Sequence, residues 1–366
     1  MLEQIAQNGT PEQRALAAQN LAATTILSDQ RQAVAKGEVP SGAKAMSAGP
    51  GKNRFVYTAD NNTSLPGRIL RQEGQPASGD TAADEAFDGA GSTYDLYKNT
   101  YQRDSIDGSG LALISTVHYS RSYDNAFWNG HQMVYGDGDE DLPVDKRMFN
   151  RFTIAIDVIG HELTHGVTQY EANLNYSGQS GALNESMSDV FGSLVKQYSL
   201  NQGARAAEWI IGAGLFTSNV NGVGIRSMKA PGTAYDDPVI GKDPQPGHMR
   251  DYVNTTQDNG GVHINSGIPN HAFYVAAYEL NGNAWEKAGK IWYATLTDRL
   301  TSTSTFQDAA SLTFAAAGDL FGVNSLEQMA VKKGWSEVGI EVGGVTPPDN
   351  PGCLSSLTSL IKLFRP

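Results

Sequence analysis

The chain has 366 residues, of which 40% are hydrophobic and 18% charged, and its formal net charge is -12. This composition is that of a folded globular protein, and the length allows more than one structural unit. The acidic charge argues against nucleic-acid partners, because proteins that bind phosphates carry a basic surface. A single cysteine, Cys353, excludes an intramolecular disulfide.

The N-terminus lacks the features of a secretory signal. No basic stretch followed by an apolar core is present there, and no run of 18 apolar residues occurs anywhere in the chain. We therefore expect synthesis as a soluble cytoplasmic chain that does not enter the membrane. Export by a non-classical route is left open.

Residues 1–50 are predicted to form a helical segment and a linker. Thr10 is followed by a proline in the first turn and by Gln13 in the capping-box position, and alanine-rich sequence continues to about Lys36. From residue 37 to 51 the chain is rich in Gly, Pro, Ser and Ala, which is typical of a flexible connection. This pattern alone does not distinguish an ordinary helix from a removable pro-segment.

Two regions with different patterns follow. Over 51–150, β-branched and aromatic residues alternate with turn signals, which favours short strands and hairpins around one helix at 81–101. Over 151–342 the pattern predicts helices at about 152–170, 181–199, 263–281, 284–300, 305–320 and 325–333. The expected fold is α+β, with a β-rich N-terminal and a mainly helical C-terminal domain. Residues 343–366 form a tail, for which a frayed end is favoured over a docking segment.

The first helix of the C-terminal region carries the HExxH pattern, His161-Glu162-Leu163-Thr164-His165. Positions four apart lie about 40° apart around a helix and one turn apart along it, so both imidazoles can reach one metal ion. Glu162 then projects beside that ion. The alternative is a surface helix whose histidines and glutamate are merely solvated.

The next predicted helix supplies a third ligand. Glu185 follows His165 by 20 residues, and its carboxylate completes a two-histidine, one-glutamate zinc site with a fourth position open to water. Asp189 lies one turn further along, so it can accept a hydrogen bond from a ligand imidazole and fix its tautomer. Asn184 is assigned to the same outer layer.

The sequence resembles the thermolysin family of metallopeptidases over roughly residues 54–340. The matching blocks are, in chain order, residues 125–130, 133–139, 161–165, Tyr176 with 181–189, and 258–267. The resemblance implies a two-domain metallopeptidase with the active-site helix between the domains. It also implies a neutral endopeptidase that acts on peptides or proteins with one catalytic zinc ion.

The resemblance assigns catalytic roles to individual residues. Glu162 would take a proton from water and pass it to the leaving amine, which a carboxylate can do because zinc lowers the pKa of its bound water toward about 7. Tyr176 and His263 would stabilise the negative charge that develops on the carbonyl oxygen. Asp258 would orient His263 and favour its charged form.

A substrate groove is implied in the same way. Asn125 and the backbone of Ala126 would bind the substrate as an added strand, and Arg226 would contact a substrate carbonyl. An apolar pocket for the residue after the cut would be lined by Phe149, Phe152, Val158, Ile211 and Ile225. We therefore expect cleavage before Leu, Ile, Val or Phe, although core packing is the alternative for any one of the five pocket residues.

The chain departs from thermolysin where that protein holds a pair of calcium ions. Asp157 matches one carboxylate, but Lys196 stands where a bridging glutamate is expected. Other expected ligand positions carry Ile210 and Ala213. An ammonium beside Asp157 could replace the charge of the cation, so no double calcium site is predicted. A single calcium site is left open in the acidic turn that contains Asp137, Asp139 and Asp141.

Residues 5–14 resemble the short pro-segment of protealysin-like members of the family, which favours a self-processing precursor that binds its own N-terminal segment. The proline-containing stretch that precedes this segment in those members is absent, from which we expect a late or truncated start. A zinc peptidase specific for one partner protein and a catalytically silent peptide-binding module are the alternatives. The histidines outside the matching blocks are interpreted as structural or surface residues: His118, His131, His248 and His271.

Overall fold

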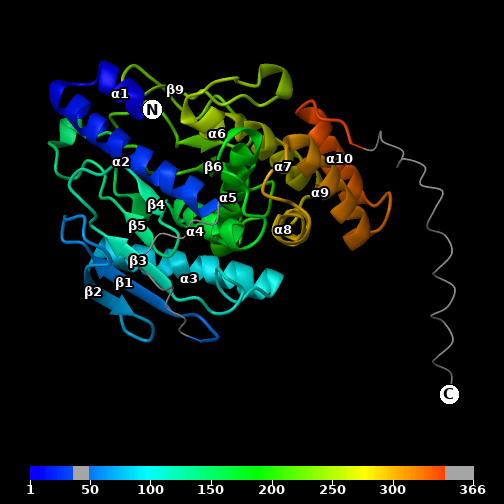
Figure 1. Ribbon diagram of the computed structural model, residues 1–366, viewed down its shortest axis with the longest axis horizontal. Coiled ribbons are helices and arrows are strands. Elements are labelled where there is room, and N and C mark those ends of the chain that lie inside the picture. The colour runs from blue at the N-terminus through cyan, green and yellow to red at the C-terminus, as the bar shows by residue number, and fades with distance from the viewer. Residues whose placement is uncertain (36–48, 343–366) are drawn as a thin grey trace.

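The structure is a computed structural model that describes residues 1–35 and 49–342 (Figure 1). Most of the predicted linker and the whole predicted tail lie outside the described residues. In the part of the chain that is described, no helix is both long and apolar enough to span a membrane.

The N-terminal segment consists of α1 (Leu2–Asn8) and α2 (Pro11–Ala35). The predicted cap of α2 is confirmed. The Gln13 N–H donates to the Thr10 hydroxyl at 3.3 Å, and the Thr10 N–H donates to the Gln13 side-chain oxygen at 2.9 Å. The helix α1 was not predicted. Figure 1 shows α2, in blue, crossing the molecule on the side of β4 and β5.

A five-stranded mixed sheet follows. In spatial order its strands are β2 (Arg68–Gln72), β1 (Arg54–Thr58), β3 (Leu113–Val117), β5 (Met133–Tyr135) and β4 (Ala126–Trp128). The two outer pairs are antiparallel, as expected for hairpins, whereas β1–β3 and β3–β5 are parallel. Parallel pairing needs a crossover, and α3 (Thr81–Tyr101) lies within the first one, at its predicted bounds. The strand β4 is the edge of the sheet on the side of the candidate site.

The second half is mainly helical, which confirms the predicted α+β fold. Its helices are α4 (Ile156–Tyr170), α5 (Gly178–Ser199), α6 (Asp258–Asn265), α7 (Gly267–Leu280), α8 (Ala288–Asp298), α9 (Phe306–Phe321) and α10 (Leu326–Glu337). Two short ladders lie between α5 and α6, formed by β6 (Ile210–Ile211) with β7 (Arg226–Ser227) and by β8 (Asp236–Asp237) with β9 (Gly241–Lys242). Figure 1 shows α4 and α5 at the centre of the molecule, between the sheet and the C-terminal helices.

Two predicted helices differ from those observed. The one expected at 152–170 is interrupted, since a 3-10 turn over Phe152–Ile154 precedes α4. Arg151 and Thr153 both bind the Glu85 carboxylate on α3, at 2.6 to 2.8 Å, and these contacts hold the turn away from the helix axis. The helix expected at 263–281 is divided between α6 and α7.

The close approach of α4 and α5 brings the candidate site together. A Cβ atom at Gly192 of α5 would lie 2.3 Å from the Asp157 carbonyl oxygen of α4, and one at Gly160 would lie 3.1 Å from the Gly192 Cα. Only glycine permits such backbone proximity. Side chains on the two facing surfaces can therefore reach a common point between the helices.

Candidate active site

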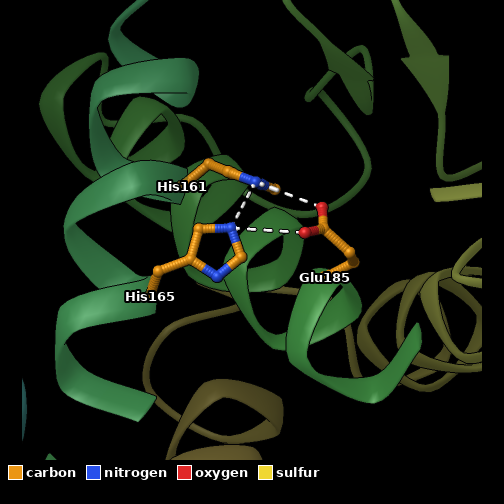
Figure 2. A group of neighbouring side chains, drawn as sticks. All are labelled: His161, His165 and Glu185. Carbon is orange, nitrogen blue, oxygen red and sulfur yellow. Dashed lines mark hydrogen bonds and ion pairs between the residues drawn. The ribbon is translucent and has the colours of Figure 1, made fainter. Parts of the chain in front are cut away.

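Two histidines of α4 point to one spot beside α5. His161 and His165 are separated by one helical turn, both are buried, and their Nε2 atoms lie 3.0 Å apart. This geometry confirms that the HExxH pattern lies on a helix and that it is not a solvated surface feature. Figure 2 shows the two rings directed toward the same point.

Glu185 of α5 reaches that point from the opposite side (Figure 2). Its carboxylate oxygens lie 3.4 Å from His161 Nε2 and 3.4 Å from His165 Nε2. Burial raises the pKa of Glu185, but His263, His165 and His161 lower it well below its usual range. The group is therefore an ionised carboxylate opposite two imidazoles.

These three residues fit a zinc ion. One ligand atom from each of His161, His165 and Glu185 lies within 4.8 Å of the others, and no other group of three or more such residues was found over residues 1–35 and 49–342. Two imidazole nitrogens and one carboxylate form the donor set of catalytic zinc sites, which leave the fourth position for water or substrate.

Hydrogen bonds fix the orientation of both imidazoles. His161 Nδ1 lies 2.8 Å from Asp189 Oδ1, and His165 Nδ1 lies 2.7 Å from Asn184 Oδ1. Both acceptors were placed in this outer layer by the sequence. Because Nδ1 donates its proton, Nε2 keeps a lone pair for a metal ion. The sequence reasoning missed Ser188, whose hydroxyl lies 3.1 Å from His165 Nδ1.

Asp189 is itself held by two further residues. Arg226 donates to both of its oxygens, at 2.7 and 2.6 Å, and Asn270 Nδ2 donates at 2.8 Å. Burial raises the pKa of Asp189, but the Arg226 guanidinium and the His161 ring lower it to about 2. Asp189 therefore remains a carboxylate. No local pattern marked Asn270, which lies on α7, 81 residues away along the chain.

Glu162 lies at the junction between α4 and the edge strand. Its side chain is buried, and the backbone N–H of Trp128 on β4 donates to its Oε2 at 3.1 Å. Its Oε1 lies 3.9 Å from His161 Nε2. This backbone donor was not predicted, since the identity of the residue carries no signal for it. The carboxylate is thus held beside the metal ligands.

His263 and Tyr176 approach the same site from the C-terminal domain. The Tyr176 hydroxyl donates to Glu185 and lies 3.2 Å from His263 Nε2. His263 Nδ1 lies 2.6 Å from Asp258 Oδ1, and the His263 N–H donates to Asp258 Oδ2 at 2.8 Å. Desolvation lowers the pKa of His263, but Asp258 and Glu185 raise it above its ordinary value. A left-handed turn over residues 258–261 makes this double contact possible.

A cavity opens onto these residues. Seven of the eight residues predicted to bind substrate line it: Asn125, Ala126, Phe149, Phe152, Val158, Ile225 and Arg226. Ile211 does not, because it is completely buried behind β7, where it is paired with Arg226. Its expected place in the pocket is therefore corrected to core packing. His161, Glu162, Glu185 and His263 also line the cavity, so the groove and the candidate metal site are continuous.

Three residues that were not predicted complete this lining: Met1, Leu2 and Asp124. The first two belong to the N-terminal segment. Ile5 of α1 is buried in the main core, and Gln13 of α2 donates to the Lys146 carbonyl at 3.0 Å. The segment is therefore packed on the rest of the protein, with its first residues inside the groove.

The acidic turn considered for calcium uses its carboxylates in internal contacts. Asp137 lies 2.8 Å from His118 Nδ1, and Asp139 accepts the N–H groups of Met148 and Phe149 at 2.7 and 2.9 Å. Asp141 is exposed. These contacts do not favour a calcium site there.

The four remaining histidines lie outside the groove lining. His118 bridges Asp137 and Asp80, and His248 accepts the Arg250 N–H. His271 stacks on Tyr274, and His131 lies in the β4–β5 turn. Their interpretation as structural or surface residues agrees with these positions.

A buried pair of histidines and a glutamate, with a second glutamate beside them and a sheet edge along the groove, define a zinc metallopeptidase. The family model for the thermolysin metallopeptidase catalytic domain matches residues 18–169, and the model for its alpha-helical domain matches residues 172–340. The chain belongs to the thermolysin family of metallopeptidases, which are zinc endopeptidases.

Individual relatives agree with this assignment. An extracellular metalloprotease of Pectobacterium carotovorum subsp. carotovorum is 51% identical over 343 residues, which cover 93% of this chain and 95% of that protein. Protease PrtS of Photorhabdus sp. (strain Az29) is 53% identical over 293 residues, 79% of this chain and 77% of that protein. The solved precursor of protealysin, a metalloproteinase from Serratia proteamaculans, is 49% identical with a TM-score of 0.82, covering 93% of this chain and 97% of that chain.

Proposed function

We propose that this chain is the precursor of a neutral endopeptidase that cuts before hydrophobic residues and removes its own N-terminal segment. The observation that carries the proposal is the cluster of His161, His165 and Glu185 at one end of a groove that Met1 and Leu2 also line. Substrate and segment would therefore use the same groove, one after the other.

His161, His165 and Glu185 would hold the zinc ion. When bound, zinc polarises a carbonyl group and lowers the pKa of a bound water toward about 7. Asp189 and Asn184 keep the two imidazoles in the tautomer that presents Nε2. Arg226 and Asn270 in turn keep Asp189 in place.

Glu162 would move the proton. Its carboxylate accepts a proton from the attacking water and delivers it to the nitrogen of the peptide bond as that bond breaks, so the residue ends as it began. The Trp128 N–H keeps one oxygen oriented, which leaves the other directed toward His161 and the groove. Proximity to the edge strand would bring this base close to a substrate that pairs with β4.

Tyr176 and His263 would stabilise the negative charge on the carbonyl oxygen. Both reach the ligand cluster from its C-terminal side, and Asp258 orients the His263 ring. A donor placed at a developing oxyanion typically contributes about 3 kcal/mol to lowering the barrier. The raised pKa of His263 keeps the ring charged, and therefore a donor, over a wider pH range.

Substrate recognition would combine strand addition with one apolar pocket. The edge strand β4 offers backbone groups to an extended peptide, a mode that tolerates many sequences. Phe149, Phe152, Val158 and Ile225 form the apolar part of the groove. A buried hydrophobic side chain in this pocket contributes roughly 2 kcal/mol, which is enough to select Leu, Ile, Val or Phe.

Three measurements on the purified full-length chain test the proposal. Casein should be hydrolysed, and a zinc chelator should stop the reaction. Quenched peptides that vary the residue after the cut should show a preference for hydrophobic side chains, and a flat profile would contradict the specificity. Intact mass should show that the wild type loses about 50 residues while Glu162→Ala stays whole. Equal behaviour of the two chains would contradict self-processing.

A further inference from the structure

One polar contact joins the N-terminal segment to the wall of the substrate groove. Asn20 of α2 is buried, and its Nδ2 donates to Asp124 Oδ2 and to the Ser122 carbonyl, both at 3.2 Å. Asp124 lies in the connection from β3 to β4, immediately before Asn125, and it lines the groove. The segment therefore covers a carboxyl group that belongs to the groove.

This contact leaves two oxygen atoms without a hydrogen bond. Asn20 Oδ1 and Asp124 Oδ1 are both buried, and neither has a partner. An ionised carboxylate can only accept hydrogen bonds, so it cannot donate to the amide oxygen. Each unsatisfied buried group costs about 1–3 kcal/mol. A proton on Asp124 would provide the missing donor, and the acid and the amide would then form a reciprocal pair.

The surroundings of Asp124 favour its neutral form. Only about 8% of the residue is exposed, and the buried Asp139 lies nearby. Burial and Asp139 raise the pKa of Asp124 well above its usual value, and the Asn20 amide opposes this shift only in part. The other titratable groups that line the cavity are the Met1 amino group, Glu162, Glu185, Arg226 and His263. None of these appears among the groups that shift Asp124.

We propose that Asp124 binds the N-terminal segment as a neutral carboxylic acid paired with the Asn20 amide, so that release of this proton to water loosens the segment from the groove. The inference adds a pH-dependent contact to the proposed precursor function, on which its biological meaning rests. It makes the segment a tighter inhibitor in acid than at neutral pH.

The direction of the effect follows from proton linkage. When the segment leaves, Asp124 faces water and its pKa returns toward about 4. The seated state therefore holds one more proton than the open state between that value and the raised pKa. Across this interval, each pH unit weakens seating by up to tenfold. Below it the seating is strongest, and above it the seating no longer changes with pH.

Hydrogen exchange of α2 in the full-length Glu162→Ala chain tests the inference without any catalytic turnover. The parent and its Asp124→Asn derivative are compared at matched pH between 5 and 8, and because α2 has the same sequence in both, intrinsic exchange rates cancel. The ratio of α2 opening, parent to Asp124→Asn, should rise at least fivefold between pH 5 and pH 7. A ratio that stays constant over this range would overturn the inference.

A matched control separates this carboxyl group from other charges at the same interface. Glu12 of α2 lies 3.8 Å from Lys146, and its side chain is largely exposed. Glu12→Gln should leave the pH dependence of opening intact. An infrared band of a protonated carboxyl group should be present in the parent at pH 6 and absent from Asp124→Asn, and its absence from the parent would refute the neutral acid directly. Because the chain is inactive, a failure of self-processing would not alter these results.

Discussion

Lys196 on α5 donates from Nζ to Asp157 Oδ2 on α4 at 3.1 Å. Asp157 is buried, and its other oxygen accepts the Gly212 N–H at 3.1 Å. The same ammonium contacts Glu208 and the Ile210 carbonyl. A protein cation thus stands at the carboxylate that was expected to help hold calcium, which supports the prediction that the double calcium site is absent. The pair also ties the active-site helix to its neighbour.

Replacement of Lys196 by methionine should destabilise the fold. The change leaves the Asp157 carboxylate buried without its cation, and the loss of one partner from a buried ion pair typically costs 3–5 kcal/mol, so about that decrease in the free energy of unfolding is expected. Urea denaturation in the Glu162→Ala background, which avoids self-digestion, measures it. Calcium should not restore the midpoint.

Glu208 provides the matched control for this experiment. Its side chain is half exposed, so Glu208→Gln should change the free energy of unfolding by less than about 1 kcal/mol. If the two variants lose the same stability, the buried position of Asp157 does not decide the strength of the interaction.

Glu162→Ala should separate metal binding from turnover. The ligands and their outer hydrogen bonds remain, so one zinc ion per chain should be retained after gel filtration. Loss of the base should lower kcat by roughly a thousandfold or more. Glu279→Gln, which removes an exposed carboxylate that pairs with Lys333 on the surface, should leave both quantities unchanged. Appreciable activity of Glu162→Ala would mean that another group moves the proton.

Asp258→Asn should shift the alkaline limb of the kcat profile to lower pH. His263 acts as a donor only when protonated, and its raised pKa delays the loss of activity as pH rises. Removal of the Asp258 charge lowers that pKa, so the limb should move down by roughly one pH unit. His263→Ala should instead lower kcat about a hundredfold with zinc still bound. An unmoved limb in Asp258→Asn would show that His263 does not set it.

The chemical residues were predictable because their pattern is local. The HExxH spacing lies within one helix, Glu185 and Asp189 lie one turn apart on the next, and Thr10 and Gln13 cap α2 within three residues. Each of these arrangements follows from helix geometry alone. The family resemblance then extended the assignment to Tyr176 and His263, which no spacing rule connects.

The missed features depend on contacts between distant parts of the chain. Asn20 and Asp124 are 104 residues apart, and Asn270 and Asp189 are 81 residues apart, so no periodicity could pair them. The 3-10 turn before α4 exists because Glu85 binds Arg151 and Thr153. The Trp128 backbone donor is invisible in a sequence because every residue except proline has one.

His118 should make the stability of the fold depend on pH above neutrality. It lies 2.8 Å from Asp137 and 3.0 Å from Asp80, the residue that caps α3. The hydrogen bond to Asp137 raises the pKa of His118 to about 9, against the effect of burial, and Asp80 adds to the increase. Because the folded pKa exceeds the unfolded value of about 6.5, the stabilisation is complete below pH 6.5 and is lost as pH rises through about 9.

His118→Asn tests this dependence, since asparagine tolerates the positive φ of 52° at this position. In the Glu162→Ala background, urea denaturation at pH 6 should show a loss of roughly 2 kcal/mol, a value reduced because a quarter of the side chain is exposed. At pH 9.5 and above the two chains should have nearly equal stability. His131→Asn is the control: burial lowers the pKa of His131, so its removal should change the profile only near and below pH 6.5. A difference for His118→Asn that is the same at pH 6 and pH 9.5 would show that the ring acts by packing and not by charge.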